Sequence, residues 1–504
     1  MTALKRIVIF LMLTGFIYLL VLQVVAIWPF TIDDMYISLR YARNWAEGAG
    51  LLWNIKEAPV EGYSNFSFVA IATFAIKLGF DPVFTLKFIG AVGLFLTTIA
   101  VYCLSRLLCS TGLALIPCVW LLLYKAQIIW AVSGLETTLY QALISFALFF
   151  LLRATGYNIY PRLRGKFNNH YFALTGLLLG LASVTRPEGP FFLLLFLGIA
   201  WFDKPVKHTI EVSRGIFWGC LIFGLVYIPY FAWRWYYFGR LFPNPVYCKG
   251  FTDSFSLEMD KNYFALVWPF FLLVLPAIWK AQDKRHFYFW LPSIVYLLLL
   301  VGSLPIAAFD NRLFLPAFTL LLPLVLVGMM RLTSYFLKQQ DEVFYGALVL
   351  EALLFAFFFI PVMSLTEYRY FTDNPKAGER LRQDVFQWLK TNVTLQNKVV
   401  LADSGMIPYL SPLDFVDSYC LNNKKMAEQP DRAMYTRFCS DVFQLKPAVI
   451  ILTSLIEKGH ITYTPADVCL HDKIQHSKLY KFRAIYSADD QQSTYRYEIY
   501  TVAN

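Results

Sequence analysis

The sequence has few charged residues, and this scarcity decides the class of protein. Only 15% of its 504 residues are charged and 58% are hydrophobic, whereas a soluble domain carries about 25% charged residues. Apolar runs of the roughly 20 residues that cross a bilayer recur as far as about residue 364. The sequence therefore predicts a polytopic α-helical membrane protein.

Closely spaced histidines and cysteines are also absent. The six histidines and eight cysteines form no CxxC or HxxxH spacing, so the sequence predicts no metal-ligand cluster. The net charge of +10 falls largely in short loops between apolar runs. Such charges orient helices in a membrane, so we predict no nucleic-acid partner and a lipid membrane instead.

The apolar runs predict about eleven transmembrane helices. The first run, 7–28, follows basic residues but is longer than the hydrophobic region of a signal peptide, so we expect it to be retained. The other runs lie at residues 82–107, 111–130, 136–154, 170–186, 189–202, 214–235, 262–280, 287–307, 313–332 and 344–364.

The basic loops indicate the orientation of these helices. Short loops rich in Lys and Arg favour the cytoplasmic side, and all of them share one side if residues 64–80 do not cross the membrane. We therefore predict that 64–80 is an interfacial helix on the outer leaflet. The transmembrane module is then 1–364, with a first outer loop at 29–81, and residues 365–504 form a periplasmic α/β domain of a bacterial inner-membrane protein.

The first outer loop opens with "PFTIDDMYISLRYARNWAEGAG", in which two carboxylates begin an amphipathic helix. We expect this helix over residues 32–47, lying in the membrane interface. Thr31 and Asp34 resemble a capping box, and Asp33 and Asp34 both suit the positive end of the helix dipole. One aspartate suffices for capping, which leaves the other free to act as a base, and either residue can take either role.

Other polar residues gather on the same predicted outer face. Ionisable groups at membrane depth are costly and mark sites or pathways. Besides the two aspartates, the candidate substrate-binding residues are Arg40, Glu61, Tyr63, Asn65, Glu136, Arg186, Glu188, Asn244, Tyr247, Lys249, Asp310 and Arg312.

This set of residues suits the transfer of a sugar from a lipid phosphate. A carboxylate can take the proton of an acceptor hydroxyl, and cations can stabilise the departing phosphate. The candidate cations are Arg186, Lys249 and Arg312. An arginine can hold a phosphate through two parallel hydrogen bonds.

Each of these residues also has a structural alternative. Arg186 can pair with Glu188, Arg312 can pair with Asp310, and Glu136 can cap the helix that follows it. A transporter or flippase for lipid-linked sugars is the alternative function. Transporters tend to place ionisable residues near the bilayer midplane and to carry internal repeats, and the sequence shows neither pattern.

A series of motifs resembles the GT-C superfamily of integral-membrane glycosyltransferases. In order they are "DDMYISLRYARNWAEGAGLLWN", "PVEGYSNFSF", "SGLETTLY", "LASVTRPEG", "FPNPVYCK" and "NRLFLP". The likeness is to the bacterial terminal arabinofuranosyltransferase branch, including a related Legionella protein. It implies a polyprenyl-phosphate sugar donor, inverting transfer to a cell-envelope glycan or glycolipid, a catalytic Asp33 or Asp34, and no metal or other cofactor.

The outer domain carries a weaker functional signal. Residues 376–391 predict a helix, "KVVLA" and "AVIIL" predict buried strands, and "STYRYEIYTV" predicts a half-exposed strand. Its "KVVLADSGMIPYLSPLDFVDSYCLNN" resembles the outer segment of the same branch. The candidate acceptor contacts are Tyr409, Asp414 and Asp417, with core or turn roles as the alternative. On the outer side we predict a disulfide between Cys420 and Cys439.

Overall fold

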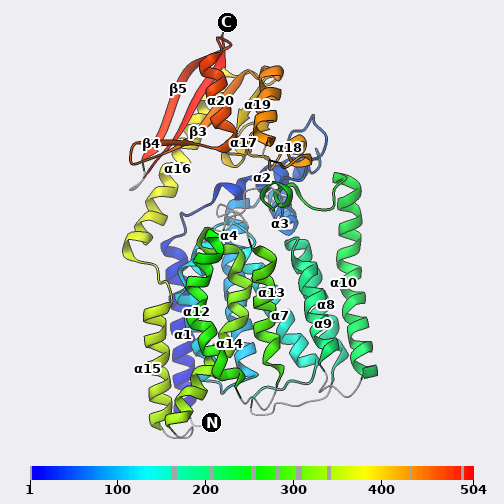
Figure 1. Cartoon of the computed structure of the whole chain (residues 1–504), viewed down its shortest axis with the longest axis vertical. Coiled ribbons are helices and arrows are strands. Elements are labelled where there is room, and N and C mark those ends of the chain that lie inside the picture. The colour runs from blue at the N-terminus through cyan, green and yellow to red at the C-terminus, as the bar shows by residue number, and fades with distance from the viewer. Residues whose placement is uncertain are drawn as a thin grey trace.

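The computed structural model describes residues 3–160, 167–203, 209–250, 257–279, 284–301, 309–337, 342–431, 433–489 and 493–503. It has two parts, a bundle of long helices and a domain with a six-stranded sheet at one end of that bundle (Figure 1). The chain is thus a multi-pass α-helical membrane protein with a C-terminal α/β domain, as the sequence predicts.

The helices of the bundle coincide with the predicted apolar runs. They are α1 (Ala3–Ala26), α4 (Pro82–Arg106), α5 (Ile116–Leu123), α6 (Lys125–Val132), α7 (Thr137–Ala154), α8 (Asn169–Thr185), α9 (Gly189–Phe202), α10 (Thr209–Phe238), α12 (Glu258–Ile278), α13 (Phe287–Leu300), α14 (Leu315–Phe336) and α15 (Glu342–Phe359). Among the described residues six helices are long and apolar enough to span a membrane, or seven with the pair Leu113–Leu123 and Lys125–Val132, which is bent by 65°. The number of eleven spans stays a prediction.

Small residues allow the central helices to pack closely. A Cβ at Gly176 of α8 would lie 2.1 Å from the carbonyl oxygen of Gly219 in α10, and a Cβ at Gly90 of α4 would lie 2.3 Å from that of Ala131 in α6. Membrane helices associate through such close backbone contact, because lipid provides no hydrophobic drive between them.

Two helices of the first outer loop lie at the end of the bundle, beneath the sheet domain (Figure 1). They are α2 (Asp33–Ala46) and α3 (Phe66–Lys77). The 12 residues of α3 reach about 18 Å, which is too short for a hydrocarbon core of roughly 30 Å. The interfacial placement of 64–80 stays a prediction.

The sheet domain is reached through α16 (Leu365–Asn392), which begins with a capping box between Ser364 and Glu367. Its sheet has the order β2-β1-β3-β6-β5, with β4 beside β3. The strands are β1 (Lys398–Leu401), β2 (Asp414–Asp417), β3 (Val449–Glu457), β4 (His460–Tyr463), β5 (Tyr480–Asp489) and β6 (Ser493–Val502), and the helices after α16 are α17 (Met406–Leu410), α18 (Lys424–Glu428), α19 (Met434–Leu445) and α20 (Pro465–His476). The strands β2, β1 and β3 are parallel, so their carboxyl ends share one edge.

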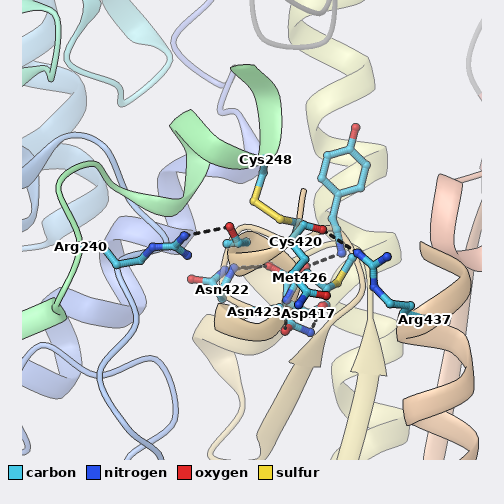
Figure 2. The surroundings of a disulfide bond; sticks show 11 residues. Arg240, Cys248, Asp417, Cys420, Asn422, Asn423, Met426 and Arg437 are labelled. Carbon is cyan, nitrogen blue, oxygen red and sulfur yellow. Dashed lines mark hydrogen bonds between the residues drawn. A yellow bond between two sulfur atoms is a disulfide. The ribbon is translucent and has the colours of Figure 1, made fainter. Parts of the chain in front are cut away.

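The predicted disulfide between Cys420 and Cys439 is wrong. The structure pairs Cys248 with Cys420 and Cys439 with Cys469. Cys439 lies on α19 against α20, whereas Cys420 follows β2 and lies beside the short helix α11 (Asn244–Gly250) (Figure 2). Cys248 and Cys420 are separated by 172 residues, so nothing in the sequence indicates that they pair.

Candidate functional site

The first turn of α2 holds both aspartates, but neither caps it through its side chain. The N-cap residue is Ile32, and it makes no side-chain capping bond. The capping box predicted from Thr31 and Asp34 is therefore wrong. Because the sheet domain lies over this turn, the helix end is met by groups from elsewhere in the chain.

Asp33 is held against the sheet domain. Its Oδ1 accepts the backbone N–H of Met406 at 3.0 Å and lies 3.0 Å from Nε of Arg382, which also pairs with Asp403 at 3.3 Å. Burial raises the pKa of Asp33 to about 6, while Arg382 opposes the rise and Asp403 adds to it. A carboxylate of this kind is ionised at neutral pH and is a stronger base than an ordinary aspartate.

Gly405 makes this close approach possible. A Cβ at residue 405 would lie 2.1 Å from Oδ2 of Asp33 and 2.3 Å from its backbone oxygen. Any other residue would push the carboxyl end of β1 away from α2. The glycine of "ADSG" is therefore needed for the sheet domain to contact Asp33, the candidate base.

Asp34 has different surroundings from its neighbour. It lies within electrostatic range of Arg312 of the bundle and of Tyr419 of the sheet domain. In the part of the chain that the structure describes, its carboxylate accepts no hydrogen bond and joins no ion pair. The two adjacent aspartates therefore face different sets of groups.

Glu136 organises the cations of the bundle. Its Oε1 lies 2.6 Å from Nη1 of Arg186 and 2.8 Å from Nη2 of Arg312, and its Oε2 accepts from Nδ2 of Asn65 at 3.0 Å. Arg186 also holds Glu188 through two bonds of 3.1 and 2.8 Å. The pairing of Arg186 with Glu188 is as anticipated, whereas Arg312 pairs with Glu136 rather than with Asp310.

Arg312 keeps hydrogen-bonding capacity after these contacts. Its Nε donates to Oγ1 of Thr137 at 3.0 Å and its Nη2 donates to Glu136. A guanidinium carries five N–H groups, and among the described residues Nη1 has no hydrogen-bond partner. The guanidinium is thus fixed in place with a free edge.

Arg186 and Arg312 line a cavity of about 700 Å³ in the bundle. This space, called here the arginine cavity, also contains Glu61, Glu188 and Arg234, and its apolar walls include Phe191, Leu194, Phe231, Phe242 and Leu299. Leu194 and Leu299 are exposed at the protein surface. The cavity therefore combines a cationic end with walls suited to a lipid chain.

Arg234 was not predicted as a site residue. Its Nε donates to Oε1 of Glu61 at 2.9 Å and its Nη2 lies 2.7 Å from Oε2, so the buried pair lines the arginine cavity. Burial raises the pKa of Glu61 to about 7, against the effect of Arg234. A lone arginine in an apolar run was the sequence signal that could have identified it.

A second cavity, of about 910 Å³, lies between α2, α16 and the sheet. It is called here the acidic cleft, because its lining has five carboxylates, from Asp33, Asp310, Glu367, Glu379 and Glu457, and two cations, from Lys125 and Arg382. Aromatic rings from Phe30, Tyr36, Tyr370, Phe371 and Tyr495 complete the lining. Carboxylates and aromatic faces are groups that can contact the hydroxyls and the C–H faces of a sugar.

A kinked segment, the 3-10 turn Phe309–Phe314, contributes residues to both cavities. Asp310 and Asn311 have φ values of 45° and 57°, in the left-handed region that is unusual for residues other than glycine. Asp310 lines the acidic cleft and Arg312 lines the arginine cavity. The kink thus gives two nearby residues to two different cavities.

Several predicted site residues have structural contacts instead. Arg40 is buried and donates to the carbonyl oxygens of Trp53 at 2.8 Å and Leu413 at 2.9 Å, and to that of Pro408. These bonds join the first outer loop to the sheet domain, and a substrate contact by Arg40 stays a prediction. Tyr63 is buried against the ring of Tyr41 at 4.8 Å and lines neither cavity.

The other predicted residues lie at the edges of the site. Asn65 accepts from Oγ of Ser38 at 2.8 Å and so links α2 to Glu136. The backbone N–H of Asn244 donates to the carbonyl of Glu61 at 2.9 Å, and the ring of Tyr247 lies 4.1 Å from the guanidinium of Arg240. The side chain of Lys249 lies outside the described residues.

In the sheet domain, the predicted acceptor contacts also have structural contacts. Asp417 accepts the backbone N–H groups of Tyr419 at 2.6 Å and Asn422 at 2.7 Å, which is the turn role anticipated as its alternative. Asp414 is in β2, and the ring of Tyr409 packs on that of Tyr36 at 5.6 Å.

Comparison by sequence gives limited information about the chain. A family described as a domain of unknown function (DUF8728) matches residues 368–500, within the sheet domain and α16. Curated proteins give no match.

Comparison by structure covers nearly the whole chain. ArnT from Cupriavidus metallidurans bound to undecaprenyl phosphate has a TM-score of 0.57 at 13% identity, over 98% of both chains. The oligosaccharyltransferase of Archaeoglobus fulgidus has a TM-score of 0.54 at 12% identity, over 94% of this chain and 80% of that one. The chain has the GT-C fold. The arabinofuranosyltransferase AftD from Mycobacteria shares it too, with a TM-score of 0.54 at 13% identity, over 97% of this chain and 42% of AftD.

Proposed function

We propose that this chain is a glycosyltransferase that moves a sugar from a polyprenyl phosphate to a glycan or glycolipid acceptor on the outer face of a bacterial inner membrane. The observation that carries the proposal is a pair of cavities of different charge. The kinked segment contributes to both of them, since Arg312 lines the arginine cavity and Asp310 lines the acidic cleft.

The arginine cavity is the proposed donor site. ArnT, which has the same fold, was crystallised with undecaprenyl phosphate. In this chain the free edge of Arg312 can hold a phosphate by charge-assisted bonds, and the apolar walls can hold the polyprenyl chain. Arg186 belongs to the same network, in which Glu136 and Glu188 fix its guanidinium at the cavity.

Asp33 is the proposed base. It lines the acidic cleft, its Oδ1 accepts the backbone N–H of Met406 and forms an ion pair with Arg382, and its pKa is raised to about 6. The acceptor oxygen attacks the anomeric carbon on the face opposite the phosphate while its proton passes to Asp33. The bond between the anomeric carbon and the phosphate oxygen breaks, and the lipid phosphate leaves with its charge stabilised by Arg312 and Arg186. The product has the inverted configuration, and the step needs no metal or other cofactor.

The acidic cleft is the proposed acceptor site. Its excess of carboxylates repels an anionic group, so we expect the sugar end that enters it to carry no phosphate. Tyr36 and Tyr495 offer rings beside Asp33 on which a sugar can pack.

Reconstituted protein tests this function directly. Proteoliposomes containing the full chain would receive a radiolabelled polyprenyl-phosphate sugar and membrane glycans, and transfer of label would be measured. Wild-type protein is expected to move label to glycan, while Asp33→Asn protein still binds undecaprenyl phosphate but transfers label about 10³-fold more slowly. Label that crosses the bilayer on its lipid, without transfer, would instead indicate a flippase.

A further inference from the structure

The outer wall of the arginine cavity is a short segment between α10 and α12. Leu241, Phe242, Pro243, Pro245 and Val246 of this segment line the cavity. Two residues beyond Val246, Cys248 is joined to Cys420 of the sheet domain (Figure 2). The wall of the cavity is therefore covalently attached to a different part of the molecule.

The inner end of this wall segment is fixed by the buried pair of Glu61 and Arg234. Nη1 of Arg234 donates to the carbonyl of Leu241 at 2.8 Å, and the backbone N–H of Asn244 donates to the carbonyl of Glu61 at 2.9 Å. These bonds hold residues 241–244 against α10 and the first outer loop. They do not reach Cys248.

The outer end of the segment depends on the sheet domain. Besides the disulfide, Nη2 of Arg240 donates to the carbonyl of Ala427 at 3.0 Å. Figure 2 shows Arg240 at the left and Cys248 above, both directed at the segment that carries Cys420. Both attachments end on the one loop and helix that run from Cys420 to Ala427.

The loop that carries Cys420 is itself rigid. Buried Asp417 accepts two backbone N–H groups of the loop, and Oδ1 of Asn422 accepts from the hydroxyl of Tyr41 in α2 at 3.0 Å. Asn422 also lies so close to Gly62 that a Cβ there would be 1.7 Å from its Oδ1. The disulfide thus joins the wall segment to a loop that already contacts the first outer loop through Asn422.

We propose that the Cys248–Cys420 disulfide positions the outer wall of the arginine cavity and so sets the affinity for the lipid phosphate. The identity of the ligand, a lipid phosphate, rests on the proposed function. The positioning of the wall by the disulfide does not. Without the bond, the wall segment keeps the hydrogen bonds at its inner end and that of Arg240, but it loses its covalent attachment to the sheet domain. The wall segment must then become ordered each time the donor binds, which lowers the affinity for the donor. The chemistry at Asp33 is unchanged.

Two double variants of the full chain test this role, C248S/C420S and C439S/C469S. The second pair is the matched control, because it removes a disulfide within the sheet domain. That disulfide joins α19 to α20, which do not line the cavity. Hydrogen exchange of residues 241–248 reports the position of the wall, and titration with undecaprenyl phosphate reports the affinity. We expect faster exchange and about tenfold weaker binding in C248S/C420S only, with the rise in KM for donor exceeding any change in kcat.

The two readouts separate the two proposals. Unchanged exchange of residues 241–248 in C248S/C420S, or equal effects in both variants, overturns the role of the disulfide. Wild-type protein that does not bind undecaprenyl phosphate overturns the proposed function, while the exchange data still decide whether the disulfide holds the wall.

Discussion

Asp33 and Asp34 are adjacent and chemically identical, yet the two sides of the α2 terminus differ. Asp33 lies on the sheet-domain side, where Met406 and Arg382 fix one of its oxygens. Asp34 lies on the other side, within electrostatic range of Arg312. Successive helix residues point about 100° apart, so one turn of helix presents one carboxylate to each side. The comparison teaches that the local surroundings, rather than the residue type, separate a base from its neighbour.

Replacing each aspartate with asparagine is the strongest test of this difference. Asp33→Asn removes the base and is expected to lower kcat by about 10³-fold, within the range that general-base catalysis contributes. Asp34→Asn removes only a nearby negative charge and is expected to lower kcat by about tenfold or less. Single-turnover transfer from a labelled donor measures both rates.

The opposite ranking would reverse the assignment. If Asp34→Asn is the inactive variant while Asp33→Asn stays active, the base is on the cation side of α2 and Asp33 serves to dock the sheet domain. Binding of undecaprenyl phosphate is the control for folding in both variants, since neither aspartate lines the arginine cavity.

Arg312 tests the cation side of the comparison. Arg312→Ala is expected to weaken binding of undecaprenyl phosphate by about 10- to 100-fold, because a charge-assisted contact to the phosphate is lost. Arg312→Lys keeps the charge but not the planar fork, and we expect partial recovery. Arg331→Lys, at the far end of α14, is the control. Equal binding in all three variants would remove Arg312 from the donor site.

The sequence predicts the general fold better than the details of the site. Apolar runs place the bundle helices because the bilayer requires internally satisfied backbone groups over a fixed length. The motifs also place Glu136, Arg186 and Arg312 on one face, and the structure joins them into one network. Sequence spacing does not show which partner an arginine selects, so the contact between Arg312 and Glu136 was not foreseen.

The contribution of the sheet domain was harder to predict. Arg382 lies on an amphipathic helix where charged residues normally face solvent, and only the docking of two domains brings it to Asp33. Contacts between residues more than 340 positions apart leave no periodic pattern in the sequence. The sequence shows Gly405 in "ADSG". Only the structure shows why a glycine is needed there, because a side chain would overlap Asp33 of α2.

Gly405→Ala tests whether the sheet domain must approach Asp33 this closely. The added Cβ would overlap the carboxylate, and such overpacking costs about 1–3 kcal/mol. We expect a lower Tm and about a tenfold fall in transfer, because Asp33 loses the donor from Met406. Gly198→Ala is the control, since nothing lies within 4 Å of a Cβ at that residue. An unchanged Tm with full transfer would show that the domain contact is dispensable.

The smallest expected effect is a shift in pH dependence. Asp33 has a pKa of about 6, so kcat/KM should fall below pH 6 as the base becomes protonated. Arg382 lowers this pKa, and Arg382→Met is therefore expected to move the acid limb to higher pH. Arg380→Met, an exposed change two residues away on α16, should leave the limb in place. If the acid limb of kcat/KM stays at pH 6 in Arg382→Met, a group other than Asp33 is titrating. Asp34 would then be the candidate base.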